Sequence, residues 1–306
     1  MTFALRLLSG ALAVMAASAP VRAAELPADA KERGAFSVKV VGSGQQSMIL
    51  IPGLLSAGDV WESVIAHFAP SYRIHVLTLA GFAGVPPLAE SDGEPSMLGR
   101  VRDDLIAYIH AERLEKPVLI GHSLGAMLAI WVATAEPASI GPIVAVDGVP
   151  FASALMNPSA VAADMAGPAE QFRSLYRSLT PEQLARQTHR ALPTMVTDAA
   201  HAETLAEWAR RSDPAATGQA LYELMTTDLR PIVQRIESAL LVVVAAKAFA
   251  SSPGGTAAVK RAYEAQVAAV PRHTVITADR ALHFVMLDDP IFLLSAIGEF
   301  LDGSAR

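Results

Sequence analysis

A short motif in the middle of the chain has the composition of a turn that exposes a nucleophile. Residues 121–125 read Gly-His-Ser-Leu-Gly; they follow the apolar run 118–120 and lead into a helical stretch over 124–135. A strand that turns directly into a helix strains the residue at its tip and needs nearly bare neighbours, here both glycine. The helix start would place the Leu124 N–H and the positive end of the helix dipole beside the Ser123 hydroxyl. The motif therefore predicts a serine nucleophile held where an oxyanion can form.

A serine hydroxyl is a weak nucleophile at neutral pH, so it needs a base within hydrogen-bond reach that a third group orients. Of the eight histidines, His283 lies just beyond a late apolar strand, on a loop that can fold back over the serine turn. His122 is next to Ser123 in sequence, but side chains around such a turn point in different directions. We therefore expect His283 to be the base and His122 to pack against neighbouring loops.

Composition sets limits on what else the chain can do. It has 306 residues, 52% of them hydrophobic, a net charge of −6 and no cysteine. This is enough apolar material for a sizeable core, and no Lys/Arg run offers a binding surface for nucleic acid. The histidines show no metal-ligand spacing and no glycine-rich phosphate loop is present, so we expect neither a metal nor a cofactor. The sequence contains no indication of oligomeric state.

The elements around the serine turn alternate between continuous apolar strands and helical stretches. Such alternation is typical of a parallel sheet that is covered by helices on both faces. The expected strands are 36–41, 48–51, 73–79, 118–120, 143–146, 240–245 and 273–276, and the expected helices around them are 60–68, 97–113, 124–135 and 291–301.

The rhythm breaks between residues 151 and 230, where no strand is evident. Helical stretches are expected instead at 168–179, 181–192, 200–211 and 214–227. Two of their starts carry capping signals, Thr180 before a proline and Asp213 before another.

The order of serine turn, helical insertion and late histidine resembles the α/β-hydrolase family over nearly all of the chain after its N-terminal segment. The resemblance implies a mostly parallel central sheet with helices on both faces, formed by residues 24–150 and 231–306, with residues 151–230 as a helical cap. It also implies that backbone N–H groups of Leu54 and Leu124 form the oxyanion hole, although Pro52-Gly53 replaces the family's usual His-Gly.

The same resemblance suggests which side chains border the substrate pocket. Phe82 follows the strand 73–79, Phe151 begins the insertion, and Phe284 follows the predicted base. We expect these three aromatic rings to form pocket walls.

The acid that orients His283 is the least regular part of the pattern. In most relatives it follows the strand that matches 240–245, but here residues 246–255 contain no carboxylate. In some relatives the acid follows the preceding strand instead, and Asp147 occupies that position. Asp279, four residues before His283, and Asp228 are the competing candidates.

The N-terminus has the pattern of a secretory signal. Arg6 precedes an apolar run over residues 7–17, and Val21-Arg22-Ala23 is a plausible cleavage site, so residues 1–23 are expected to be removed. The prediction is an exported, periplasmic or secreted protein without a stable membrane anchor; an uncleaved anchor is the alternative.

Together these features predict an exported serine hydrolase that cleaves carboxylic esters of small, largely apolar molecules through an acyl-enzyme. Serine at position 123, where some capped relatives have aspartate, disfavours dehalogenase and epoxide hydrolase chemistry. Other acyl transfer, C–C bond hydrolysis or perhydrolysis on the same residues is the enzymatic alternative. A hydrolase fold that only binds a small apolar ligand is the non-enzymatic one, favoured by the missing carboxylate after strand 240–245.

Overall fold

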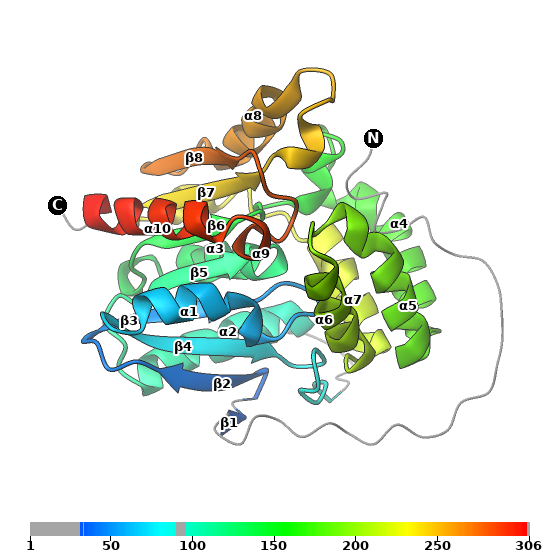
Figure 1. Cartoon of the computed structure of the whole chain (residues 1–306), viewed down its shortest axis with the longest axis horizontal. Coiled ribbons are helices and arrows are strands. Elements are labelled where there is room, and N and C mark those ends of the chain that lie inside the picture. The colour runs from blue at the N-terminus through cyan, green and yellow to red at the C-terminus, as the bar shows by residue number, and fades with distance from the viewer. Residues whose placement is uncertain (1–30, 33, 90–95, 305–306) are drawn as a thin grey trace.

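The computed structural model describes residues 31–32, 34–89 and 96–304, so the predicted signal segment lies outside the described residues. One sheet in the order β1-β2-β4-β3-β5-β6-β7-β8 forms the centre of the molecule (Figure 1). Its strands are β1 (Lys31–Glu32), β2 (Phe36–Val41), β3 (Gln46–Ile51), β4 (Tyr72–Leu79), β5 (Val118–His122), β6 (Ile143–Val146), β7 (Leu240–Ala245) and β8 (His273–Ala278). All neighbouring strands from β4 to β8 pair in parallel, whereas β2 pairs antiparallel with β4 and β1 antiparallel with β2. The predicted fold class is confirmed, and β1 is a short strand that was not predicted.

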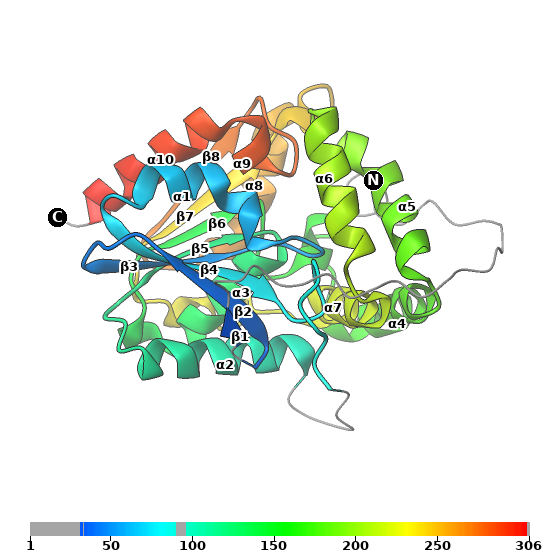
Figure 2. The same cartoon turned by 60° about the horizontal axis from the view of Figure 1, so that its bottom comes forward.

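Helices cover both faces of this sheet. Figure 2 shows α1 and α10 above the strands and α2 and α3 below them. The helices packed around the sheet are α1 (Glu62–Phe68), α2 (Met97–Ala111), α3 (Leu124–Ala135), α8 (Gly255–Val267), α9 (Val285–Asp288) and α10 (Pro290–Ser304). Helix α8 was not predicted. It makes the crossover between the parallel strands β7 and β8, a connection that normally needs a helix.

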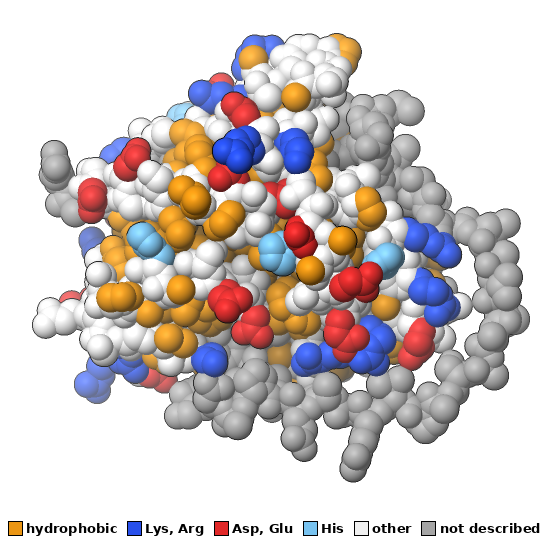
Figure 3. Space-filling view, viewed as in Figure 1, with side chains coloured by type: hydrophobic (Ala, Val, Ile, Leu, Met, Phe, Trp, Pro, Cys, Tyr) orange, Lys and Arg blue, Asp and Glu red, His pale blue; other side chains and the backbone are white. Residues whose placement is uncertain are grey.

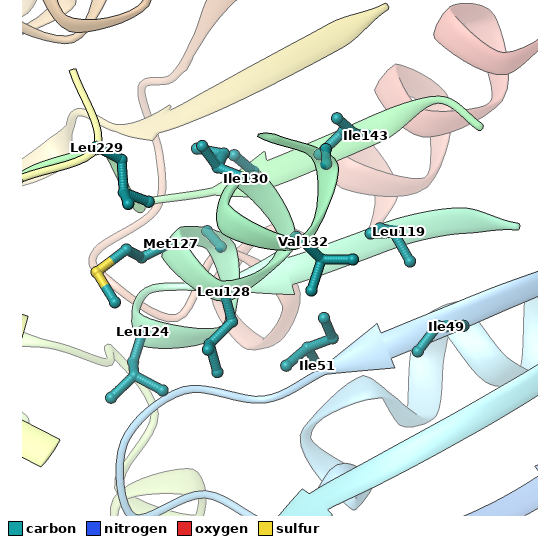
Figure 4. Close-up of a cluster of buried hydrophobic side chains, with 14 of the residues drawn as sticks. Ile49, Ile51, Leu119, Leu124, Met127, Leu128, Ile130, Val132, Ile143 and Leu229 are labelled. Carbon is teal, nitrogen blue, oxygen red and sulfur yellow. The ribbon is translucent and has the colours of Figure 1, made fainter. Parts of the chain in front are cut away.

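The central strands are buried on both faces, which explains why they read as continuous apolar runs. Along β3, Met48 and Leu50 belong to the core cluster on the α1 and α10 side, while Ile49 and Ile51 belong to the cluster on the α2 and α3 side. Figure 4 shows the second cluster, in which side chains of α3 such as Leu128 lie beside those of the sheet. The core therefore holds α3, and with it the serine turn, rigidly against the strands.

Four helices are inserted between β6 and β7 and lie beside the carboxyl ends of the central parallel strands (Figure 1). They are α4 (Ala162–Arg177), α5 (Pro181–Ala191), α6 (Ala199–Arg210) and α7 (Pro214–Thr226). Helix α5 begins at the predicted cap, where Thr180 and Gln183 satisfy each other's backbone N–H groups. Helix α4 begins at Ala162, six residues before the predicted start, and contains Pro168 within it. The helix tolerates this proline at the loss of one backbone hydrogen bond.

The two ends of the insertion meet at one place, shortly after the end of β6. The Leu229 N–H donates to the Pro150 carbonyl at 3.1 Å. The Arg230 guanidinium lies 4.8 Å from the centre of the Phe151 ring and forms an ion pair with Asp228. We call this contact between residues 150–151 and 228–230 the neck of the insertion.

The surface carries charges of both signs. On the face shown in Figure 3, Lys and Arg side chains are interspersed with Asp and Glu rather than gathered into one basic area. Within residues 31–32, 34–89 and 96–304, no helix is both long enough and apolar enough to cross a membrane.

Candidate active site

The serine turn has the strained geometry that its sequence predicts. Ser123 connects β5 to α3 with φ 54° and ψ −114°. Residues other than glycine rarely adopt this backbone conformation. A Cβ atom added to Gly121 would lie 2.1 Å from the Gly125 carbonyl oxygen, so no larger residue fits there. The Ser123 N–H donates to the Val146 carbonyl at 2.9 Å, which ties the turn to the end of β6. The half-buried Ser123 side chain faces a cavity.

His283 and Asp147 come together although 136 residues separate them. The His283 Nδ1 atom lies 2.6 Å from Asp147 Oδ2, and both side chains are buried. Asp147 directly follows β6 with φ 47°, and its own N–H donates to the Val243 carbonyl at 2.8 Å. Both side chains line the cavity that Ser123 faces. The structure thus gathers the three residues predicted to do the chemistry around one space.

The competing acids lie elsewhere. Asp228 is held by Arg230 through hydrogen bonds of 2.9 and 2.6 Å at the neck of the insertion. Asp279 is exposed at the surface. Of the three candidates, the structure pairs Asp147 with His283.

Two further groups donate to the Asp147 carboxylate, and sequence reasoning missed both. Its Oδ1 atom accepts hydrogen bonds from the Ala245 N–H at 3.0 Å and from the Tyr263 hydroxyl at 2.8 Å. Ala245 ends β7, the strand whose following loop lacks a carboxylate, and Tyr263 lies on α8. Because α8 was not predicted, the sequence reasoning did not single out Tyr263.

His122 holds the histidine loop through a hydrogen bond to the backbone of His283. Its Nε2 atom lies 3.0 Å from the His283 carbonyl oxygen, and since a carbonyl can only accept, His122 carries its proton on Nε2. Burial, with the neighbouring His283 charge, lowers the pKa of His122 well below its usual value, so the ring stays neutral. This arrangement agrees with the expectation that His122 packs against neighbouring loops.

Asp288 at the end of α9 is a second anchor of the histidine loop. Its Oδ2 atom accepts the Leu282 N–H at 2.9 Å, and its Oδ1 atom accepts the N–H and the hydroxyl of Thr197, both at 2.8 Å. Thr197 belongs to the helical insertion, so one carboxylate ties the insertion to the residue that precedes His283.

The loop after β3 passes directly beside the serine turn. A Cβ atom added to Gly53 would lie 2.8 Å from His122 Nδ1 and 3.3 Å from Ser123 Cβ. The next residue is Leu54, whose N–H was predicted to stabilise an oxyanion together with the N–H of Leu124 at the start of α3. The bare glycine is what allows the loop to approach the nucleophile this closely.

The cavity has a volume of about 350 Å³ and is mostly apolar. Its walls come from the insertion, from the segment after β7 and from α8; Leu155, Met165, Leu221, Met225, Phe249 and Val259 are among them. No Lys or Arg is among the described residues that line it. Also within the described part of the chain, no group of three or more His, Asp or Glu side chains gathers as metal ligands would.

The three aromatic residues expected to form pocket walls do not line this cavity. Phe82 is fully buried in the core cluster on the α2 and α3 side. Phe151 is fully buried in a small cluster of its own and lies under the Arg230 guanidinium, and Phe284 packs against the His122 ring with ring centres 4.8 Å apart. These three rings are buried away from the cavity, whereas Phe249 and Tyr263 are the aromatic residues that line it. The prediction for these three residues was wrong.

Comparison with known proteins agrees with this fold. Residues 48–296 match the alpha/beta hydrolase family, and the chain belongs to that family. A thermophilic esterase from Thermogutta terrifontis superposes with a TM-score of 0.72 at 18% identity, covering 91% of this chain and 100% of the esterase. An enol-lactonase from Burkholderia xenovorans LB400 superposes with a TM-score of 0.69 at 13% identity, covering 87% and 96%. At these identities the likeness concerns the fold.

Two curated relatives match shorter stretches. A pimeloyl-[acyl-carrier protein] methyl ester esterase of Pectobacterium carotovorum is 28% identical over 113 residues, 37% of this chain and 41% of the relative. The karrikin insensitive 2 receptor CA of Petunia hybrida is 26% identical over 116 residues, 38% of this chain and 43% of the relative. The chain thus spans about two fifths of the length of these relatives.

Proposed function

We propose that this chain is a serine hydrolase that cleaves carboxylic esters of small, uncharged and largely apolar molecules through an acyl-enzyme. The observation that carries the proposal is the 2.6 Å hydrogen bond between His283 and Asp147 beside the cavity that Ser123 faces. Relatives named as esterases support the same reaction class. The missing carboxylate after β7 favoured a purely binding role; in this proposal Asp147, 2.6 Å from His283, takes the place of that carboxylate.

Each group has a defined task in this mechanism. Asp147 accepts the Nδ1–H of His283, so the lone pair lies on Nε2, which takes the hydroxyl proton of Ser123 as its oxygen attacks the ester carbonyl. The N–H groups of Leu54 and Leu124 would receive the developing oxyanion. His283 then returns the proton to the leaving alcohol, and a water activated by the same nitrogen hydrolyses the acyl-enzyme.

The cavity wall supports the choice of substrate class. Its lining is dominated by Leu, Met, Val and Ala, and among described residues it offers no cation that could pair with a carboxylate of the substrate. An unpaired charge in such a space loses its hydration without compensation. Flexible methionines, among them Met165 and Met225, suit an apolar chain of variable shape.

The test combines a covalent probe with matched substrates. A fluorophosphonate should label the wild-type protein and leave Ser123→Ala unlabelled. p-Nitrophenyl hexanoate should be hydrolysed with a kcat/KM at least about tenfold higher than the mono-p-nitrophenyl ester of adipic acid, which differs in its terminal carboxylate. An unlabelled wild-type protein would refute the reaction, whereas equal rates on the two esters would refute the substrate class alone.

Export is part of the same proposal and rests on the pattern of residues 1–23. N-terminal sequencing of protein recovered from a bacterial periplasm or culture medium should then begin near Ala24. Recovery of the intact chain with Met1, in the membrane fraction alone, would instead favour an uncleaved anchor.

A further inference from the structure

The carboxylate of Asp147 has a partner that the proposed mechanism does not use. Oδ2 faces His283, while Oδ1 accepts the Ala245 N–H at 3.0 Å and the Tyr263 hydroxyl at 2.8 Å. A buried carboxylate needs donors on both oxygens to remain ionised. The Ala245 donor belongs to the sheet, so Tyr263 is the side chain that completes the set.

Tyr263 is placed so that it remains a donor. Its side chain is buried, with 3% of its surface exposed. Burial, followed by the negative charge of Asp147, raises the pKa of Tyr263 well above its usual value, so the phenol keeps its proton over the working pH range. A neutral phenol can only serve a carboxylate by donating to it.

The same residue also lies in the cavity wall. Tyr263 lines the cavity together with Ala258, Val259 and Ala262 of α8. Helix α8 therefore contributes both to the space for the substrate and to the hydrogen bonding of the acid. The segment after β7 lacks a carboxylate of its own, and the helix that follows it donates to the carboxylate of the neighbouring strand end instead.

We propose that Tyr263 is a positioning residue that acts through Asp147: its hydroxyl fixes the carboxylate with Oδ2 toward His283 and neutralises part of the charge on Oδ1. This inference rests on the proposed function, in which Asp147 orients the base. Without the hydroxyl, Oδ1 keeps one donor and the carboxylate can turn more freely. Its less compensated charge also attracts a protonated His283 more strongly.

The pH dependence expected from this contact involves few groups. Among the described residues, the titratable side chains bonded to the Asp147 carboxylate are His283 and Tyr263. On its other side, His283 packs against the neutral His122 with ring centres 4.5 Å apart. Removing the Tyr263 hydroxyl should therefore make His283 easier to protonate, which moves the acidic limb of the pH–rate profile to higher pH.

The variant Tyr263→Phe removes the hydroxyl and keeps the ring in the cavity wall. We expect kcat/KM for p-nitrophenyl hexanoate to fall about tenfold, almost entirely in kcat, with KM within about twofold of wild type. The acidic limb should move up by roughly half a pH unit. Tyr108→Phe is the matched control, because that buried phenol bonds His75 at 2.7 Å on the antiparallel side of the sheet. It should leave both the rate and the limb unchanged.

A double-mutant cycle separates action through Asp147 from a direct effect on substrate. In an Asp147→Asn background, Tyr263→Phe should change kcat by less than about twofold. A full tenfold loss there, or an unchanged kcat and limb in the single variant, would overturn the proposal. A variant that loses too much activity for kinetics can still be tested by titrating the His283 imidazole, because that measurement needs no turnover.

Titration of the His283 imidazole by NMR on histidine-labelled protein is independent of catalysis. The midpoint should lie at higher pH in Tyr263→Phe than in wild type, and an equal midpoint would refute the inference. If fluorophosphonate fails to label wild type while the midpoint still moves, the proposed reaction is wrong and the contact between Tyr263 and the acid stands. If labelling succeeds and the midpoint does not move, the proposed reaction stands and the inference about Tyr263 is wrong.

Discussion

Replacing Asp147 by asparagine should disable the base without disturbing the fold. On the Oδ1 side, the Ala245 N–H at 3.0 Å can only donate and so requires an acceptor, and the Tyr263 hydroxyl at 2.8 Å donates to the same atom. They will therefore hold the amide oxygen of the introduced asparagine on their side and turn its NH₂ group toward His283 Nδ1. An NH₂ group donates, so Nδ1 must accept and the imidazole proton moves to Nε2. The base then has no free lone pair for the hydroxyl of Ser123.

The size of the effect follows from this tautomer switch. A base in the wrong tautomer costs on the order of 10⁴-fold in kcat, while substrate binding in the apolar cavity should leave KM nearly unchanged. The amide has almost the shape of the carboxylate and keeps both Oδ1 donors paired, so the melting temperature should change little. Steady-state hydrolysis of p-nitrophenyl hexanoate and the rate of fluorophosphonate labelling both measure the loss.

Asp279→Asn is the matched control, because Asp279 is exposed and should be silent. If Asp147→Asn kept more than about a tenth of the wild-type kcat, the tautomer argument would fail. If Asp279→Asn lost kcat by orders of magnitude instead, the acid that orients His283 would belong to the histidine loop.

Three further predictions concern other parts of the structure. Ser123→Gly should raise the free energy of unfolding in urea by about 1 kcal/mol relative to Ser123→Ala, because glycine relieves the positive φ and alanine does not; equal stabilities would count against strain. Gly53→Ala, whose Cβ would meet His122 Nδ1 at 2.8 Å, should lower kcat/KM about tenfold or more at normal stability; a fully active variant would show that the loop can give way. Burial lowers the pKa of His75 to about 4, below its value of about 6.5 in the unfolded chain. The unfolded state then binds more protons between these pH values, so unfolding free energy should fall as pH drops from about 6.5 to about 4, and His75→Gln should flatten that slope; an unchanged slope would rule His75 out as its source.

The parts of the fold that the sequence could predict are those whose pattern is local. The buried strands β6 and β7 have the predicted bounds because an apolar run flanked by turns defines both ends. The serine turn was predictable because its two glycines answer a steric requirement within a single short motif. Asp147 was harder, since nothing local distinguishes an acid that reaches a histidine 136 residues away from one that only makes a turn.

Other features depend on contacts that a single sequence does not display. Helix α8 is rich in alanine and mixes polar with apolar positions, so its period is weak, although the parallel pairing of β7 and β8 demands a crossover there. Tyr263 could have been noticed as one of three apolar or aromatic residues at a spacing of four, with Val259 and Val267. Which aromatic rings face the cavity was not predictable. The sequence pattern does not say whether a ring that follows a strand, such as Phe82 or Phe151, points into the core or into the cavity.

The neck of the insertion suggests how such a protein can change its substrates over evolutionary time. Pro150 and Leu229 are joined by a hydrogen bond, so the two ends of the helical insertion come together at one point before the chain runs on to β7. A longer, shorter or different set of helices could be exchanged there without altering the register of β6 and β7, whose ladder begins at Ile143 and Leu240. The part of the cavity wall that the insertion supplies can then diverge quickly while the serine turn, Asp147 and the histidine loop are inherited unchanged.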